Sequence, residues 1–173
     1  SPLPSSLSSR SSVWACARGR LASRESGALV MAEGDSRFVK REDGEVKYER
    51  KDSGLTEFPT DIPSDCTAID LDFNSISTIP DVPFPELKEL HLMRNKLKTV
   101  PPSVFQLPKL KLLDLDQNQL AELPEAIDLP ALKELDLRLN KLSRVPDALF
   151  RIQTLEVLCL HENLLTELPE AID

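Results

Sequence analysis

The residues of this chain that could do chemistry are mostly carboxylates spaced two apart, so that both side chains of an extended segment point the same way. Asp70 and Asp72 form one such pair, and Asp114 and Asp116 form another. Paired carboxylates can serve general acid–base catalysis, but this chemistry also needs a pocket and a shifted pKa. An open strand face offers neither, so we expect this chain not to be an enzyme.

A second cluster could hold a metal ion. Cys159 and His161 lie two apart beside Glu162, and Asp136 falls at the equivalent position of an earlier segment. A zinc site needs three or four converging ligands, and His161-Glu162-Asn163 lacks the H-E-x-x-H spacing of a zinc helix. The chain also lacks the G-x-x-x-x-G-K-[ST] phosphate loop. We therefore predict no metal and no cofactor.

Five asparagines, the only ones in the chain, mark the elements that must position these residues. They follow one another at intervals of 21, 23, 22 and 23 residues: Asn74, Asn95, Asn118, Asn140 and Asn163. Apolar residues stand eight, five and three positions before each asparagine and two and five positions after it. A proline comes directly after the last of these apolar residues. One copy reads Leu110, Leu113, Leu115, Asn118, Leu120, Leu123, Pro124. Its apolar step of two predicts a strand with one buried face.

This frame, L-x-x-L-x-L-x-x-N-x-L repeated every 20 to 29 residues, is the leucine-rich repeat signature. It predicts an α/β fold, a right-handed β-α superhelix in which a parallel concave sheet is joined by short irregular or 3-10 return legs. Cys66 occupies the first leucine slot and is predicted to be a buried apolar substitute. The asparagines are expected to form a structural ladder, in which each amide bonds backbone groups that no strand reaches.

The 23-residue form with Leu-Pro after the asparagine, as in Asn118-Gln-Leu-Ala-Glu-Leu-Pro, resembles the Ras-group intracellular leucine-rich repeat proteins. That family includes the Scribble-type and adenylate-cyclase-type arrays, and the resemblance covers residues 55–173. It implies a concave protein-binding surface, a cytoplasmic scaffold in signal transduction, and a small GTPase or a phosphatase as partner. Fold alone does not fix function.

Two alternatives stay open. Residues 54–65 resemble the start of extracellular arrays such as those of proteoglycans and Toll-like receptors, which favours an extracellular adhesion or immune receptor. The caps of those families carry paired cysteines just upstream, whereas no cysteine lies between Cys16 and Cys66. The other alternative is the recognition arm of a larger enzyme, such as a kinase, GTPase or ubiquitin ligase, continuing beyond residue 173.

Charge is unevenly distributed along the chain. Residues 1–30 carry four arginines and one glutamate, a net +3, so the total of −8 leaves −11 for residues 31–173. An acidic body argues against nucleic acid and anionic membranes as partners. No apolar run approaches the roughly 18 residues that a spanning helix needs, so we expect no membrane insertion.

The chain divides into three parts. Residues 1–30 are rich in serine and arginine without apolar periodicity, which predicts a disordered leader; it is either upstream sequence outside the natural protein, with Met31 as the start, or a transit peptide. Residues 31–65 are predicted to be an N-terminal extension and cap, with an edge strand over 45–50. Residues 66–173 hold five repeats, and we expect the array to be truncated at residue 173.

Side chains between the buried strand leucines are predicted to face the concave surface, where a protein partner would bind. The central column is Asp70, His91, Asp114, Asp136 and Cys159. The second column is Asp72, Met93, Asp116, Arg138 and His161. The third column, just before each asparagine, is Phe73, Arg94, Gln117, Leu139 and Glu162.

Three residues of these columns are candidate anchors, because binding hot spots favour large apolar or aromatic side chains and arginine. They are Phe73, Met93 and Leu139. The two arginines, Arg94 and Arg138, are expected to pair either with carboxylates of a partner or with the neighbouring aspartates of the array.

Overall fold

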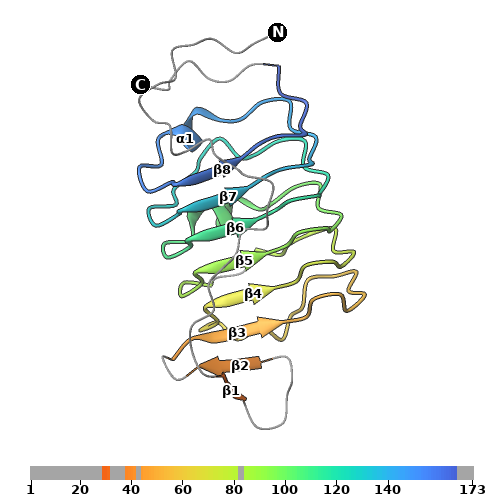
Figure 1. Ribbon diagram of the computed structural model, residues 1–173, viewed down its shortest axis with the longest axis vertical. Helices are drawn as coiled ribbons and strands as arrows, with labels where there is room; N and C mark the ends of the chain where they lie inside the picture. Colours follow the sequence, from red (N-terminus) through yellow and green to blue (C-terminus); the bar gives the residue numbers. More distant parts are fainter. Residues whose placement is uncertain (1–28, 32–37, 42–43, 82–83, 167–173) are drawn as a thin grey trace.

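The computed structural model describes residues 29–31, 38–41, 44–81 and 84–166, and within them one sheet of eight strands follows the order of the chain (Figure 1). The strands are β1 Leu29–Met31, β2 Phe38–Arg41, β3 Val46–Glu49, β4 Ala68–Asp70, β5 Glu89–His91, β6 Leu112–Asp114, β7 Glu134–Asp136 and β8 Val157–Cys159. Most of the predicted leader and the last predicted return leg, residues 1–28 and 167–173, lie outside the described residues.

Strands β3 to β8 are parallel and in register. Each repeat adds one three-residue strand, and its middle residue faces the core in a row: Ile69, Leu90, Leu113, Leu135 and Leu158. Side chains of a strand alternate between its two faces, so the residues on either side of this row lie on the opposite, concave face. The solenoid predicted from the sequence is confirmed.

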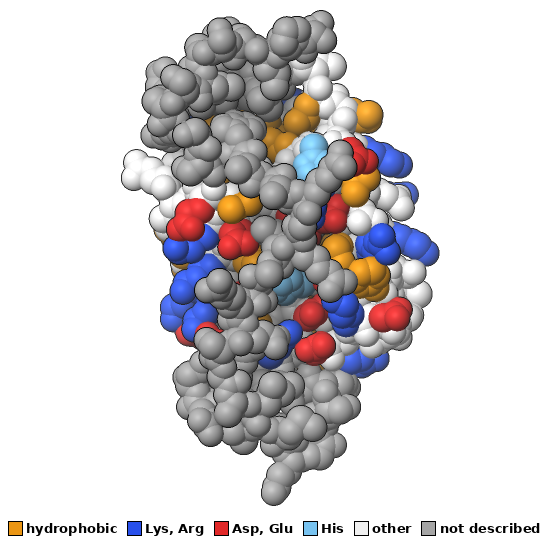
Figure 2. All heavy atoms as spheres, viewed as in Figure 1, with side chains coloured by type: hydrophobic (Ala, Val, Ile, Leu, Met, Phe, Trp, Pro, Cys, Tyr) orange, Lys and Arg blue, Asp and Glu red, His pale blue; other side chains and the backbone are white. Residues whose placement is uncertain are grey.

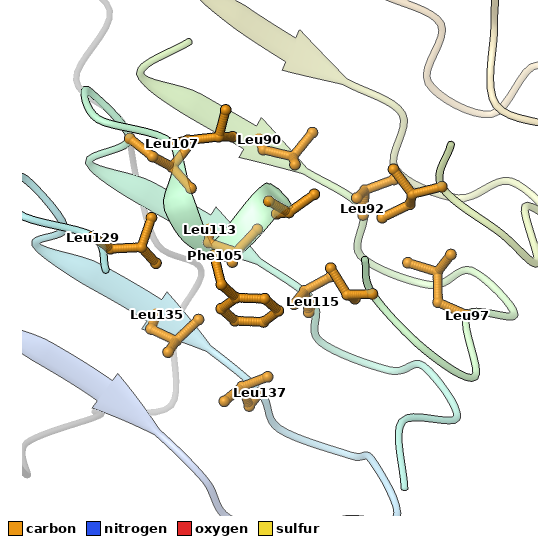
Figure 3. Close-up of a cluster of buried hydrophobic side chains, with 14 of the residues drawn as sticks. Leu90, Leu92, Leu97, Phe105, Leu107, Leu113, Leu115, Leu129, Leu135 and Leu137 are labelled. Carbon is orange, nitrogen blue, oxygen red and sulfur yellow. The ribbon is translucent and has the colours of Figure 1, made fainter. Parts of the chain in front are cut away.

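The return legs close the core on the side away from the sheet. Two of them form regular turns, the 3-10 helix η1 Pro102–Gln106 and the single-turn helix α1 Asp147–Phe150. Figure 3 shows the ring of Phe105, which is fully buried, lying among leucines of neighbouring repeats such as Leu113 and Leu135. Cys66 is likewise fully buried, and burial raises the pKa of its thiol to about 11, as suits its predicted apolar role.

The N-terminal cap differs from the prediction in one respect. The segment predicted as an edge strand is β3, which lies inside the sheet: it pairs in parallel with β4 and antiparallel with β2, which in turn pairs with β1. The hairpin covers the backbone edge that would otherwise be open. Tyr48 of β3 is fully buried and donates its hydroxyl hydrogen bond to Asp61 Oδ1 at 2.9 Å, which ties the cap to the first return leg. Strand β1 crosses the predicted boundary at residue 30.

The asparagine amides join each repeat to the one before it. Asn118 Nδ2 donates to the carbonyl of Leu115 in its own repeat (3.1 Å) and to that of Leu92 in the preceding repeat (2.9 Å). Its Oδ1 accepts the Leu97 backbone N–H at 3.0 Å. The other four asparagines make the same kinds of bond. These backbone groups lie outside the strands, and a buried one left unpaired costs about 1–3 kcal/mol.

Every residue immediately before a ladder asparagine has a left-handed backbone. Their φ values are 57° at Phe73, 54° at Arg94, 54° at Gln117, 50° at Leu139 and 57° at Glu162. This region is uncommon for residues with a Cβ. The tight turn aims each following amide at the core, so the fold imposes this conformation in all five repeats whatever side chain is present.

Replacing Asn118 with alanine is therefore expected to lower the free energy of unfolding by about 3 kcal/mol, because three buried backbone groups lose their partner. Urea denaturation followed by circular dichroism measures this. Gln119→Ala, at the half-buried neighbouring position, is the control and is expected to change stability by less than about 0.5 kcal/mol. Equal stability of the two variants would show that the amide does not hold the turn.

Candidate protein-binding surface

The central column of the predicted site forms a continuous row across the sheet. Asp70, His91, Asp114, Asp136 and Cys159 end their strands and are direct neighbours in the pairing register. Adjacent strands lie about 4.8 Å apart, so carboxylates of β6 and β7 lie side by side. The structure thus brings this column together as one strip, and its aspartates are buried.

The second column continues the strip beyond the strand ends. Backbone carbonyls of this column accept bonds from third-column residues of the preceding repeat, for example from the Arg94 N–H to the Asp116 carbonyl and from the Gln117 N–H to the Arg138 carbonyl. Asp72 and Asp116 are buried here, whereas His161 is exposed. Acidic, basic and hydrophobic side chains consequently intermix over the strand-bearing face (Figure 2).

The third column occupies a different place from the one predicted. Its five residues come after the strands end and form the left-handed turns described above; this series of turns is called the rim below. Phe73 lies between two cations, Lys51 Nζ and Arg94 Cζ, each 5.1 Å from its ring centroid. Arg94 Nε also donates to Gln117 Oε1 at 2.8 Å. Leu139 is 38% exposed.

Aspartates of the central column also bond the backbone, a role that was not predicted from the sequence. Asp70, Asp114 and Asp136 each accept the N–H of the residue two positions later through Oδ1, at 3.2, 3.0 and 3.1 Å. Such local side-chain bonds compete with strand pairing, which fits the end of each strand at that aspartate. The signal in the sequence was an aspartate at one frame position in three of five repeats.

Cations of the array neutralise some of these carboxylates. Arg138 contacts Asp136 by both Nε and Nη2 and lies 3.5 Å from Asp116, so it pairs inside the array, one of the two alternatives predicted for it. Lysines of the cap, which the sequence analysis did not include in the site, reach the first repeat. Lys47 lies 3.8 Å from Asp70.

The other cap lysine, Lys51, lies 3.4 Å from Asp72. Among the described residues no cation forms an ion pair with Asp114. Arg94, the other arginine considered for pairing, stacks on Phe73 instead.

Burial raises the pKa of three of these carboxyl groups, and repulsion between neighbouring carboxylates adds to the shift. Burial raises the pKa of Asp114 to about 7, although the bond from the Asp116 N–H opposes the shift, and Asp136 and Asp72 add repulsion. Burial likewise raises the pKa of Asp72 and of Asp136. For His91, burial disfavours the charged form, but the bond to Glu89 and the surrounding aspartates outweigh it, so the pKa is raised.

Metal-ligand clusters, membrane-spanning helices and hollows can be recognised only within the part of the chain that the structure describes. No group of three or more histidines, cysteines and acidic residues there is placed to hold a metal ion, and no helix there is long and apolar enough to cross a membrane. An open hollow of about 300 Å³ lies between two return legs. Its lining is Ile127, Asp128, Leu129, Pro130, Ala148, Arg151, Ile152, Gln153 and Thr154, which includes no cysteine or histidine.

A parallel sheet wound into a solenoid, with an amide at each turn and a polar concave wall, defines the class of leucine-rich repeat arrays. Residues 66–120 and 85–142 match the family model described as leucine rich repeat. The array over residues 66–142 is therefore a leucine-rich repeat array.

Relatives match over part of this array. Leucine-rich repeat-containing protein 3 of Mus musculus is 38% identical over 65 residues, which is 36% of this chain and 25% of the relative. Lumican of Gallus gallus is 40% identical over 75 residues, 40% of this chain and 22% of the relative. The chain thus spans only about a quarter of the length of these relatives. They support the repeat array and do not single out the predicted Ras-group branch.

Two solved structures share the fold. A chain of the octameric complex of latrophilin 3, Unc5D and the leucine-rich repeats of FLRT2 superposes with a TM-score of 0.59 and 32% identity, covering 67% of this chain and 38% of that one. YopM from Yersinia enterocolitica WA-314 superposes with a TM-score of 0.53 and 32% identity, covering 73% and 26%.

The raised pKa values predict that the array is more stable at mildly acidic pH. Between the ordinary pKa of an aspartate, near 4, and about 7, the folded chain binds more protons than the unfolded chain at Asp114, so stability falls as pH rises through this window. The raised pKa of His91 acts in the same direction. We expect a higher melting temperature at pH 5.5 than at pH 8.

Asp114→Asn is expected to stabilise the chain at pH 8 by on the order of 2 kcal/mol and to flatten this pH dependence. The amide oxygen can still accept the Asp116 N–H, so the turn is kept. Asp128→Asn, at an exposed return-leg position, is the control and should leave the profile unchanged. Melting curves across this range that rise with pH would contradict the assignment.

Proposed function

We propose that this leucine-rich repeat array is a protein-binding module whose concave face, with the rim of left-handed turns, contacts the partner. The observation that carries the proposal is Leu139, a large apolar side chain that is 38% exposed on a rim where the fold has no packing use for it. Apolar and arginine side chains at the centre of a surface are typical hot spots.

The comparison with FLRT2 supports the same kind of function. Its leucine-rich repeats form part of an octameric complex with latrophilin 3 and Unc5D, so an array similar to this one takes part in a protein assembly. We propose a binding role without catalysis for the residues described here. The alternative of a recognition arm within a larger enzyme attributes the same binding role to this face.

A second candidate concerns the place where the module works. The start of the array, residues 54–65, resembles extracellular arrays, and the relatives include lumican, keratocan and osteomodulin. Together these matches favour extracellular recognition over the predicted cytoplasmic scaffold with a GTPase or phosphatase partner. Staining of a tagged full-length protein on unpermeabilised cells would separate the two: signal at the surface or in the medium favours the extracellular role, and signal only after permeabilisation rejects it.

The binding surface can be tested with exposed rim residues that form no ion pair among the described residues. Arg94→Glu combined with Leu139→Glu is expected to remove the partners that the wild-type chain captures in quantitative affinity purification, without lowering the melting temperature. Arg138 is left unchanged in this design because it neutralises aspartates inside the array.

The matched control places the same charges on the return-leg side, as Arg151→Glu combined with Ala126→Glu, both at exposed positions. Capture by this control should equal capture by the wild type. Partners that survive the rim variant and disappear in the control would place the interface on the convex side and reject the proposal.

A further inference from the structure

We propose that the concave face is built for a basic protein segment, with a lysine or arginine of the partner seated on Asp114 and Asp116 and an adjacent apolar residue packed on Leu139. This inference rests on the proposed function and names the chemistry of its partner. Its basis is a shortage of positive charge at one point of the strip and a leucine at a strained, exposed position beside it.

The aspartates of the strip are neutralised unevenly. The first repeat draws on the cap, since Lys47 and Lys51 pair with its two aspartates. The fourth repeat supplies Arg138 for Asp136. The third repeat has two aspartates and no lysine or arginine of its own in the concave columns, so it relies on a share of Arg138 and on His91 of the second repeat, which is the neighbour of Asp114 in the register.

Specific carboxylate oxygens of the third repeat lack a donor or a counter-ion. Asp116 Oδ1 is buried and has no hydrogen-bond partner, and only its Oδ2 lies near Arg138, at 3.5 Å. Asp114 accepts one backbone N–H and forms no ion pair among the described residues. Buried carboxylate oxygens without a donor are costly. A guanidinium or ammonium group supplies several donors and the missing charge at once.

Leu139 gives an independent indication. Its φ of 50° is imposed by the turn, and a leucine in this region costs about 1–2 kcal/mol relative to a residue that tolerates it, such as glycine or asparagine. Its counterparts Phe73 and Arg94 stack on each other, whereas Leu139 is exposed. Because all five turn residues share this strain, what sets Leu139 apart from Phe73 and Arg94 is an exposed apolar side chain outside the core, which suggests selection for contact.

The two features belong to the same pair of repeats. Leu139 directly follows Arg138, whose guanidinium lies against both Asp136 and Asp116. A partner with a basic residue next to an apolar one can therefore engage both features together. An acidic partner would meet a strip that already has surplus negative charge.

Fluorescence anisotropy of the full 173-residue chain tests this with two labelled peptides, one of alternating arginine and leucine and one of alternating glutamate and leucine. We expect saturable binding of the arginine peptide only. Binding should weaken at least tenfold when NaCl is raised from about 50 to 500 mM, because the screening length falls roughly threefold. Equal binding of both peptides, or binding indifferent to salt, would overturn the proposal.

Variants locate the contact. Asp114→Asn with Asp116→Asn keeps the backbone acceptor and should weaken binding of the arginine peptide at least tenfold, about 1.4 kcal/mol. Leu139→Asn should weaken it severalfold while raising the melting temperature, a combination that loss of folding cannot produce. Glu125→Gln with Asp128→Asn removes two exposed charges from a return leg and should have no effect. If the control loses as much affinity as the Asp114/Asp116 variant, binding depends only on the net charge of the chain and the proposed site is rejected.

The basic segment at the start of this chain is the competing occupant, since residues 1–30 carry a net +3. Replacing Arg10, Arg18, Arg20 and Arg24 with serine distinguishes it. Similar binding before and after replacement supports a separate partner, whereas binding that emerges only afterwards assigns the face to the chain's own segment. If the rim variant abolishes capture of cellular partners but the arginine peptide never binds, the proposed function stands and this inference fails.

Discussion

The carboxamide of each ladder asparagine is the interaction on which the rest of the structure depends. It satisfies two carbonyls and one N–H that lie beyond the strands, and it does so across the boundary between repeats, as at Asn118. Leucine burial alone would leave these groups without partners in a core that excludes water. Because the amide provides hydrogen-bond partners for these backbone groups, a strand can end after three residues and the chain can turn sharply into its return leg.

That turn also determines the binding surface. The left-handed residue before each asparagine forms a rim, and the strand-ending aspartates cap the backbone on the concave side, so polar side chains bond the backbone on both faces of the sheet. The aspartates on the concave side accumulate charge, which cap lysines and Arg138 offset unevenly. The aspartates that cap the strand ends therefore also form an acidic strip. Residues beside this strip, such as Leu139, distinguish this array from others with the same fold.

The fold could be predicted from the sequence because the same pattern of leucines and asparagine occurs five times at nearly constant spacing, so each copy confirms the alignment of the others. The sequence was also sufficient to place the central column on one face of the sheet, since alternation along a strand follows from geometry. It could not show that Phe73 and its equivalents sit on left-handed turns, because a backbone angle imposed by the neighbouring amide leaves no mark on the side chain chosen. The pairing of Lys51 with Asp72 was equally hidden, since it joins two segments whose contact depends on how the cap docks.

Hydrogen exchange at the backbone amides held by asparagine side chains is the most direct measurement of this account. The N–H groups of Leu97 and Leu120 donate to the Oδ1 atoms of Asn118 and Asn140, outside any strand. The account predicts that they exchange as slowly as the strand amides of Leu113 and Leu135. Exchange at the rate of an unprotected loop amide would show that the carboxamides do not hold the array together, and would contradict the account.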